Sequence, residues 1–340
     1  MKILLDAFGG DNAPEEVVKA ATEYVRGGGK ADICLVGKQE VINKLLDDCG
    51  FEKSPAITVM NATEVITCEE SPTEAFKKKP DSTISVAMNA LKTGEYGAFV
   101  SAGSTGALLT AAVLKAGRIK GVSRPALATM MPTVTGECLF LDCGANADCK
   151  PINLVHFAVM ADVYMKKVKK VENARIGLLC NGTEDKKGSE LTHAVFAALK
   201  QIPSLNFIGN VEGRDILSGA CDIVVTDGFS GNVALKSIEG AVNIMLHFLK
   251  RNIKESASAK FGYLFMKKAF KKTMKTLDYN SRGGAVFLGV NGVIAKSHGS
   301  SRSKSFVGTL YQAECALEND INAEIEARIN SDEIKGIKFE

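Results

Sequence analysis

Short apolar runs alternate with helix-length segments along the whole sequence. The runs lie at residues 3–5, 33–36, 57–59, 98–100, 139–141, 176–179 and 223–225. Strands that alternate with helices usually pair in parallel, because the helix returns the chain to the edge of the sheet from which it started. The pattern therefore predicts a three-layer α/β/α fold around a mostly parallel, doubly wound sheet. Functional loops are expected at the carboxyl ends of its strands.

The chain is predicted to form one domain. It has 340 residues, 46% of them hydrophobic, and no internal repeat or linker-like stretch divides it. We expect a single domain over residues 1–340, with a helical elaboration at about residues 244–278. The sequence lacks an apolar run of about eighteen residues and begins with a strand-like segment, not a signal peptide. These features predict a cytoplasmic protein.

The segment at residues 226–236 joins a predicted strand to a predicted helix, and its sequence is Thr-Asp-Gly-Phe-Ser-Gly-Asn-Val-Ala-Leu-Lys. The helical pattern begins near Val233, so the residues before it are expected to form a loop. Glycines allow a tight turn, and unpaired N–H groups at a helix start attract anions such as phosphate. An ordinary α/β turn would have a similar composition. The candidate phosphate ligands are Asp227, Ser230, Gly231, Asn232 and Lys236.

Two upstream junctions have the same form. Ser101-Ala-Gly-Ser-Thr-Gly106 precedes the helix-like residues 107–116, and Asp6-Ala-Phe-Gly-Gly-Asp11 closes the first strand. Neither has the spacing of a GxGxxG dinucleotide motif or of a P-loop, so we expect no nicotinamide or other cofactor. They contribute the candidate phosphate ligands Ser104, Thr105, Asp6, Gly9 and Gly10.

Two asparagines follow later strands. Asn146 lies in Asp142-Cys-Gly-Ala-Asn-Ala-Asp148, and Asn181 lies in the polar segment at residues 180–189. Either amide could donate to a carbonyl or phosphate oxygen. The acids beside Asn146 could bind Mg²⁺, but acids at strand ends commonly cap helices, and the nearby cysteines lack a second Cys/His pair for zinc. We therefore predict no metal.

His298 differs from the other three histidines, which lie in helical apolar patterns. It sits in a polar loop, two residues after Lys296. An imidazole in such a loop can act as an acid or base near neutral pH, and a lysine can hold an anion. A helix cap or a loop hydrogen bond is the structural alternative. No Ser-His-Asp triad with a GxSxG motif can be assembled, which disfavours a serine hydrolase.

A basic amphipathic segment lies near the carboxyl-terminal third of the chain. Residues 250–275 contain nine Lys and Arg and one acid, a local net charge of +8, whereas the whole chain is +3. Such a helix suits an anionic membrane or an acidic protein, or it packs on the core or on a second subunit. The acidic remainder and the lack of a binding motif predict no nucleic-acid partner. The predicted contact residues are Tyr263, Met266, Phe270, Lys271, Lys272 and Met274.

Taken together, these segments resemble the phosphate acyltransferases of bacterial phospholipid synthesis, the PlsX family. The resemblance runs from the first strand to about residue 300, with Phe8 where the family more often has Met. The matching motifs are Asp6-Ala-Phe-Gly-Gly-Asp11 with Ala13-Pro14, Ser101-Ala-Gly-Ser-Thr-Gly106, Ser123-Arg-Pro125, Leu141-Asp-Cys-Gly-Ala-Asn146, Asn181-Gly-Thr-Glu184, Asp227-Gly-Phe-Ser-Gly-Asn232 and Ser297-His-Gly-Ser300.

The resemblance implies conversion of acyl-[acyl carrier protein] and inorganic phosphate into an acyl phosphate and free acyl carrier protein. The acyl phosphate then feeds a membrane glycerol-3-phosphate acyltransferase. The resemblance also implies a fold similar to isopropylmalate dehydrogenases and phosphotransacetylases, a homodimer, and peripheral attachment to the inner face of the cell membrane. Two alternatives remain open: a phosphotransacetylase-like enzyme that uses acyl-CoA, and a non-catalytic protein that binds acyl or phosphorylated ligands.

Phosphate is itself a nucleophile, so the reaction needs positioning and oxyanion stabilisation, without a covalent intermediate. We hypothesise that the loops with Ser104 and Asn232 bind phosphate, aided by Lys236 or Lys296. Asn146 or Asn181 is expected to donate to the oxyanion, and His298 to assist proton transfer to the departing thiolate.

Overall fold

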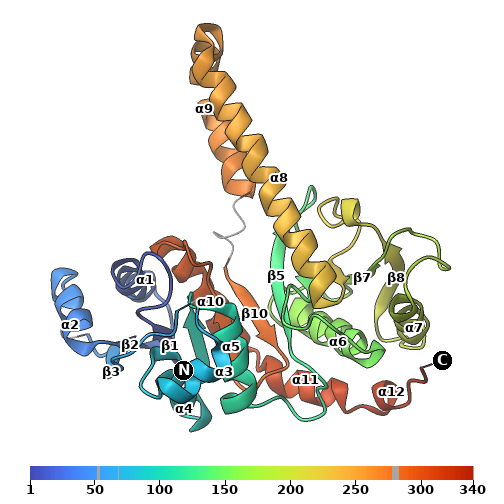
Figure 1. Ribbon diagram of the computed structural model, residues 1–340, viewed down its shortest axis with the longest axis horizontal. Helices are drawn as coiled ribbons and strands as arrows, with labels where there is room; N and C mark the ends of the chain where they lie inside the picture. Colours follow the sequence, from blue (N-terminus) through green and yellow to red (C-terminus); the bar gives the residue numbers. More distant parts are fainter. Residues whose placement is uncertain (52–53, 68, 278–282, 340) are drawn as a thin grey trace.

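The computed structural model describes residues 1–51, 54–67, 69–277 and 283–339. One 11-stranded sheet with the order β3-β2-β1-β4-β11-β10-β5-β6-β9-β7-β8 runs through the body of the protein (Figure 1). The strands are β1 (Lys2–Asp6), β2 (Asp32–Gly37), β3 (Ile57–Asn61), β4 (Ala98–Ser101), β5 (Ala126–Pro132), β6 (Glu137–Leu141), β7 (Arg175–Leu179), β8 (Asn206–Val211), β9 (Ile223–Val225), β10 (Ala285–Leu288) and β11 (Val293–Lys296).

The mostly parallel sheet and the predicted strands are confirmed. Each predicted apolar run lies within β1, β2, β3, β4, β6, β7 or β9. The sheet also contains β5, β8, β10 and β11, which the sequence analysis did not predict. Of these, β10 and β11 form an antiparallel pair with no helix between them, so the alternation of strands and helices does not indicate them. Gly209 interrupts the apolar pattern of β8.

Two groups of parallel strands, running in opposite directions, meet at the centre of the sheet. One group contains β1, β2, β3, β4 and β11, and the other contains β6, β7, β8 and β9. The antiparallel strands β10 and β5 join them. Lys296 at the end of β11 pairs with Ala285, while Thr129 pairs with Phe140 near the end of β6. The carboxyl ends of both groups therefore converge at the centre.

Helices cover both faces of the sheet, because strand side chains alternate between two cores. Leu4 belongs to the core beneath α3–α5 and the base of α8, and Ile3 to the core beneath α1, α2, α6, α7 and α10–α12. The helices are α1 (Glu15–Arg26), α2 (Gln39–Asp48), α3 (Pro72–Lys78), α4 (Thr83–Lys92), α5 (Thr105–Ala111), the π-helix η1 (Ala112–Ala116), α6 (Pro151–Lys167), α7 (Glu190–Leu199), the 3-10 helix η2 (Gly213–Asp215), α8 (Gly228–Glu255), α9 (Ala257–Leu277), α10 (Ser303–Glu318), α11 (Ile321–Ile329) and α12 (Asp332–Lys335).

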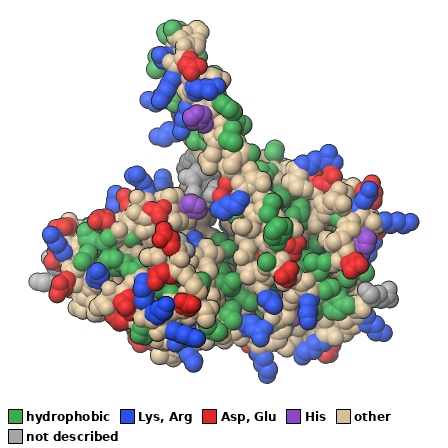
Figure 2. Space-filling view, viewed as in Figure 1, with side chains coloured by type: hydrophobic (Ala, Val, Ile, Leu, Met, Phe, Trp, Pro, Cys, Tyr) green, Lys and Arg blue, Asp and Glu red, His purple; other side chains and the backbone are tan. Residues whose placement is uncertain are grey.

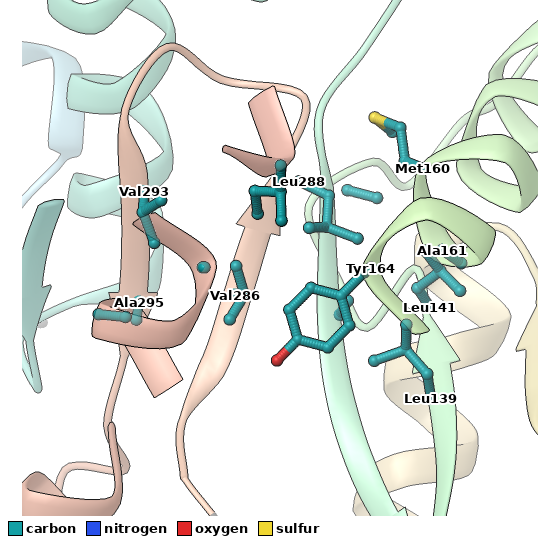
Figure 3. Packing of buried hydrophobic residues seen from close by; sticks show 14 of the residues in the cluster. Leu139, Leu141, Met160, Ala161, Tyr164, Val286, Leu288, Val293 and Ala295 are labelled. Atoms are coloured by element: carbon teal, nitrogen blue, oxygen red, sulfur yellow. The ribbon is translucent and has the colours of Figure 1, made fainter. Parts of the chain in front are cut away.

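The central strands are buried under α6, which is apolar on nearly all sides. Tyr164 of this helix projects toward β10 and β6, where Val286, Leu288, Leu139 and Leu141 pack around it (Figure 3). Tyr164 is 1% exposed, and its hydroxyl accepts a hydrogen bond from Gln312 Nε2 of α10 (2.7 Å). This packing fixes the antiparallel centre, and thereby the position at which the strand ends converge.

Helices α8 and α9 form a hairpin that projects far from the body (Figure 1). The predicted elaboration at residues 244–278 falls on the outer half of α8 and on α9, apart from residue 278, which lies outside the described residues. Helix α8 begins at Gly228, directly after β9, so its first turns belong to the body and only its outer part projects. One continuous helix therefore connects the sheet to the hairpin tip.

Candidate active site

An open pocket lies where the strand ends converge. It is bordered by α5, β5, the turn after β6, the first turns of α8, the start of β10 and the end of β11. Its position agrees with the rule that ligands bind outside the carboxyl ends of strands where the strand order changes. Its lining residues are Thr105, Leu127, Thr129, Cys143, Gly144, Asn232, Leu235, Lys236, Glu239, Gly283, Gly284, Ala285, Lys296, Ser297 and His298.

Five predicted site residues meet in this pocket: Thr105, Asn232, Lys236, Lys296 and His298. They come from α5, α8 and the end of β11, so segments far apart in the sequence supply them. Their side chains offer hydroxyl, amide, ammonium and imidazole groups to one space. The other predicted site residues, all within the described chain, lie outside the pocket lining; they are Asp6, Gly9, Gly10, Ser104, Asn146, Asn181, Asp227, Ser230 and Gly231.

Asp6 supports the loop after β4 through hydrogen bonds. It is 1% exposed, and its Oδ2 accepts a hydrogen bond from Ser101 Oγ (2.7 Å), which accepts one from the backbone N–H of Gly103 (2.9 Å). Burial raises the pKa of Asp6 above its usual value. A Cβ on Gly9 would lie 2.6 Å from Asp6 Oδ2, so glycine is required there. Asp6 and Gly9 thus shape the loop that ends at Ser104, which caps α5 by accepting from Ala107 N.

The loop after β1 also holds the turn that carries His298. The backbone N–H of Asp11 donates to Gly299 O (2.8 Å), and Asn12 Nδ2 donates to Ser300 O (3.1 Å). Gly10 has φ +100, in the left-handed region that favours glycine, and a Cβ there would lie 3.0 Å from Gly299 O. The first strand therefore contributes to the site by positioning the residues after β11.

Asn146 is part of a buried turn built around Asp142. Its Nδ2 donates to Pro125 O (2.7 Å) and to Asp142 Oδ2 (2.8 Å). Asn146 is 5% exposed, and these two bonds use both hydrogens of its amide. In this arrangement Asn146 therefore has no amide hydrogen left for the predicted donation to a substrate oxyanion. Asn181 lies in the exposed loop after β7, and its Oδ1 accepts from Cys180 Sγ (3.5 Å).

The start of α8 differs from the expected loop. The helix begins at Gly228, not near Val233, and Asp227 is its N-cap. The N–H groups of Gly228 and Gly231 donate to Asn146 O (2.8 Å) and Asp227 O (2.9 Å), and that of Ser230 donates to Asp227 Oδ1 (2.9 Å). These donors are satisfied by the protein, so they do not present the free anion site that the glycine-rich sequence suggested. Asn232 and Lys236 reach the pocket with their side chains instead.

Two lysines and one glutamate line the pocket. Lys236 Nζ contacts Glu239 Oε2 at 2.8 Å, and Lys296 Nζ donates to Ser297 O (3.2 Å). The pKa of His298 is lowered from its usual value, first by partial burial and then by Lys296. His298 is therefore neutral near neutral pH. Among the described residues, no group of three or more His, Cys, Asp and Glu could hold a metal ion.

Glu239 is a charged residue of the pocket that the sequence analysis did not predict. Its side chain is 15% exposed, whereas that of Lys236 is 58% exposed. The signal was available, because Glu239 lies three residues after a predicted phosphate ligand on a predicted helix, and such residues share a helix face. An acid repels phosphate on charge alone, but here Glu239 pairs with Lys236.

The basic segment forms the outer hairpin, with a different apolar surface from the predicted one. Tyr263, Phe270 and Met274 are partly buried, and the rings of Tyr263 and Phe270 lie 5.5 Å apart. Met266 is exposed, and so are the bulky residues near the α8–α9 turn. Figure 2 shows apolar, Lys and Arg side chains together on the projecting hairpin. The bulky apolar residues exposed on α9 include Phe261, Leu264, Phe265 and Met266, and the predicted lysines Lys271 and Lys272 are exposed as well.

None of the helices in the described part of the chain combines the length and hydrophobicity needed to cross a membrane.

Comparison with known proteins identifies the family. A family model described as "Fatty acid synthesis protein" matches residues 1–324. A phosphate acyltransferase of Thermoanaerobacterium thermosaccharolyticum is 42% identical over 340 residues, covering 99% of this chain and 100% of that protein. A phosphate acyltransferase of Clostridium novyi is 44% identical over 329 residues, covering 97% of this chain and 98% of that protein. The chain belongs to the phosphate acyltransferase family.

Solved structures show the same fold at low sequence identity. A phosphotransacetylase from Streptococcus pyogenes aligns with a TM-score of 0.61 and 20% identity, covering 94% of each chain. A branched-chain phosphotransacylase from Enterococcus faecalis aligns with a TM-score of 0.59 and 13% identity, covering 94% of this chain and all of that one. The predicted family, enzyme class and fold similarity to phosphotransacetylases are therefore confirmed.

Proposed function

We propose that this phosphate acyltransferase transfers an acyl group from acyl-[acyl carrier protein] to inorganic phosphate, which yields an acyl phosphate and free acyl carrier protein. The observation that carries the proposal is the composition of the central pocket. Lys236, Lys296 and Asn232 can bind phosphate there, and Leu127 and Leu235 line the same pocket with apolar groups that suit an acyl chain.

In this reaction a phosphate oxygen attacks the thioester carbonyl carbon. The C–O bond forms, the tetrahedral oxyanion collapses, and the C–S bond breaks. The proton of hydrogen phosphate leaves with the carrier-protein thiolate as a thiol. The chain holds the reactants together and stabilises the developing charge, which supplies most of the rate enhancement in reactions of this kind. Thr105 and Asn232 are proposed phosphate ligands, and Asp6, Gly9, Gly10, Ser104, Asp227, Ser230 and Gly231 are proposed to position them.

Acyl carrier protein is the proposed acyl donor because it is an acidic protein and the hairpin is strongly basic. Lys267, Lys268, Lys271 and Lys272 are all exposed on α9. Opposite charges on two surfaces accelerate their encounter and orient the complex. An acyl-CoA donor would not need this surface, so the choice of donor separates the proposed activity from that of a phosphotransacetylase.

The exposed apolar residues of the hairpin support two further proposals. Phe229, Val233, Ile244 and Phe248 recur along α8 at helical spacing and are exposed in the single chain. A second copy of α8 would cover them, which supports a homodimer. At the hairpin tip, Phe261, Leu264 and Phe265 lie among lysines and would enter an anionic lipid surface. We propose a cytoplasmic enzyme held at the inner face of the membrane, where acyl phosphate is passed to a membrane glycerol-3-phosphate acyltransferase.

The deciding experiment incubates the purified protein with phosphate and either a long-chain acyl-[acyl carrier protein] or the matching acyl-CoA. Acyl phosphate is trapped with hydroxylamine, and free thiol is measured in parallel. The proposal expects phosphate-dependent formation of both products, with a higher kcat/KM for the carrier-protein thioester. Preference for acyl-CoA would support the phosphotransacetylase-like alternative, and binding without turnover would support a non-catalytic role.

A further inference from the structure

The hydrogen bonds of His298 define its tautomer. Nδ1 accepts a hydrogen bond from the backbone N–H of Ser300 (3.3 Å) and lies 2.8 Å from Ser300 Oγ. A backbone N–H can only donate, so Nδ1 must offer its lone pair, and Ser300 Oγ then donates to it as well. The single ring hydrogen of the neutral imidazole is therefore on Nε2.

The turn around His298 holds the ring at the pocket and leaves Nε2 as the ring nitrogen available to a ligand. His298 lines the pocket, whereas Ser300, which holds Nδ1, does not. The turn is closed by a bond from Ser301 N to His298 O (2.9 Å) and is anchored on the first strand through Asp11 and Gly299. Among the described residues, Nε2 has no hydrogen-bond partner of its own. Its N–H is the edge of the ring that a substrate can reach.

We propose that neutral His298 donates a hydrogen bond from Nε2 to the thioester carbonyl oxygen as that oxygen becomes an oxyanion, and that Ser300 positions the ring. This inference rests on the proposed acyl transfer and replaces the expected role of His298 in proton transfer. A neutral imidazole that gave its Nε2 hydrogen to the thiolate would become an imidazolate, which is strongly disfavoured near neutral pH. Donation without transfer avoids that step and leaves the phosphate proton for the leaving thiol.

The surrounding charges are consistent with a neutral donor. Lys296 on β11 and Lys236 on α8 oppose protonation of the ring, while Glu239 on α8 and Asp11 after β1 favour it. Partial burial and Lys296 prevail, so the pKa of His298 lies below its usual value. Protonation would also place a hydrogen on Nδ1 and disrupt its bond from Ser300 N–H. Both effects keep the donor in one tautomer.

Two substitutions separate donation from acid–base chemistry. His298→Gln can place an amide N–H near the position of Nε2, whereas His298→Asn places it near that of Nδ1. Loss of one oxyanion donor lowers kcat by about 100-fold or more. We expect that loss in His298→Asn and His298→Ala, with His298→Gln retaining at least about tenfold more activity than either. Equal losses in the Gln and Asn variants would overturn the proposal.

The pH profile gives an independent readout. A neutral donor is fully active at and above neutral pH and loses activity only as acid protonates the ring, whereas an acid loses activity as the pH rises. Compared with His298→Gln, the wild-type kcat should therefore not fall between about pH 6 and about pH 8. His298→Gln serves as the control, because its pH profile contains the titration of phosphate but not that of the imidazole. A fall confined to the wild type would refute donation by the neutral ring.

Nitrogen NMR of the free protein tests the tautomer without turnover. The imidazole signals of His298, identified by their absence in His298→Gln, should show hydrogen on Nε2 and not on Nδ1. Ser300→Ala removes the shorter bond to Nδ1 and leaves the longer bond from the backbone N–H. It should therefore lower kcat several-fold and raise the share of the tautomer with hydrogen on Nδ1, and Ser300→Thr should restore both. A hydrogen on Nδ1 in the wild type would overturn the inference. If the wild type instead has the expected tautomer but makes no acyl phosphate, the proposed function fails, and with it the role of the donor.

Discussion

Gly231, in the first turn of α8, packs directly against the backbone of Asp142, so that a Cβ on Gly231 would overlap the Asp142 carbonyl oxygen. The neighbouring glycine on the same helix is similarly confined, since a Cβ on Gly228 would lie 2.7 Å from Asp142 Oδ2. This contact sets the distance between α8 and the turn after β6, and both elements line the pocket. The two glycines of the motif are therefore packing requirements.

Gly231→Ala should lower the free energy of unfolding by about 1–3 kcal/mol, because the added methyl group must displace backbone atoms. Gly240→Ala is the matched control on the same helix, since a Cβ there meets nothing within 4 Å. The control should be neutral or stabilising by up to about 1 kcal/mol, as alanine favours a helix over glycine. Urea unfolding followed by circular dichroism measures both. Equal stability of the two variants would contradict the close contact.

Asn232→Ala should lower kcat/KM for phosphate by about 10-fold to 100-fold, the effect of losing a hydrogen bond to a charged group. The side chain is exposed within the pocket, so the unfolding free energy should change little. Asn252→Ala, on the exposed outer part of α8, is the control. Initial rates at limiting phosphate give the comparison. Asn232 would be removed from the site if both variants had the wild-type dependence on phosphate.

Lys236 and Glu239 should shift phosphate affinity in opposite directions. Lys236→Gln removes a positive charge from the pocket and should raise KM for phosphate by about tenfold, while Glu239→Gln removes a negative one and should lower it. The Lys236→Gln shift should shrink more than the Glu239→Gln shift as ionic strength rises, because Lys236 is 58% exposed and Glu239 only 15%, and salt screens exposed charges most. An increase in KM for both variants would show that Glu239 acts mainly by holding Lys236 in place.

His156 should make the protein less stable in acid. It is 5% exposed, its Nδ1 accepts from Ser123 N (3.1 Å), and burial lowers its pKa from 6.5 to about 4. The folded state resists protonation that the unfolded state allows, so stability present above about pH 6.5 is lost as the pH falls toward about 4. The loss approaches about 3 kcal/mol.

His156→Asn tests this dependence, because its amide oxygen lies near the position of Nδ1, can accept from Ser123 N and does not titrate. The difference in unfolding free energy between the two proteins, measured in urea across this pH range, isolates His156 from other acid-sensitive groups. Parallel pH curves for the wild type and the variant would show that His156 is not buried in its neutral form.

Membrane binding should depend on the hairpin tip. Phe265→Glu puts a charge on an exposed residue, 77% accessible, and should release the protein from vesicles that contain anionic lipid. Phe270→Glu is the comparison, since Phe270 is partly buried beside Tyr263 and should chiefly lower the melting temperature. Sedimentation with vesicles at two salt concentrations measures both. Full lipid binding by Phe265→Glu would exclude the tip as the attachment site.

Much of the protein could be predicted from local sequence. The strands around Ile3, Ile33 and Ile223 were recognisable because buried parallel strands are continuous apolar runs bounded by turns. Polar motifs along the chain identified the family and predicted Thr105, Asn232, Lys236, Lys296 and His298, all of which line the pocket. This success has a simple basis: the ends of parallel strands collect polar loops on one side of a sheet.

The tertiary structure decided which of these residues face the pocket and which support it. Asp6 and Asn146 have the same polar character as the pocket residues, but their side chains form hydrogen bonds within the protein, and the backbone N–H of Ser230 donates to Asp227. Sequence determined the elements and the chemical groups at their ends, because both depend on neighbouring residues. The antiparallel centre, the early start of α8, the place of Glu239 and the tautomer of His298 depend on contacts between distant segments, and only the folded chain brings those segments together.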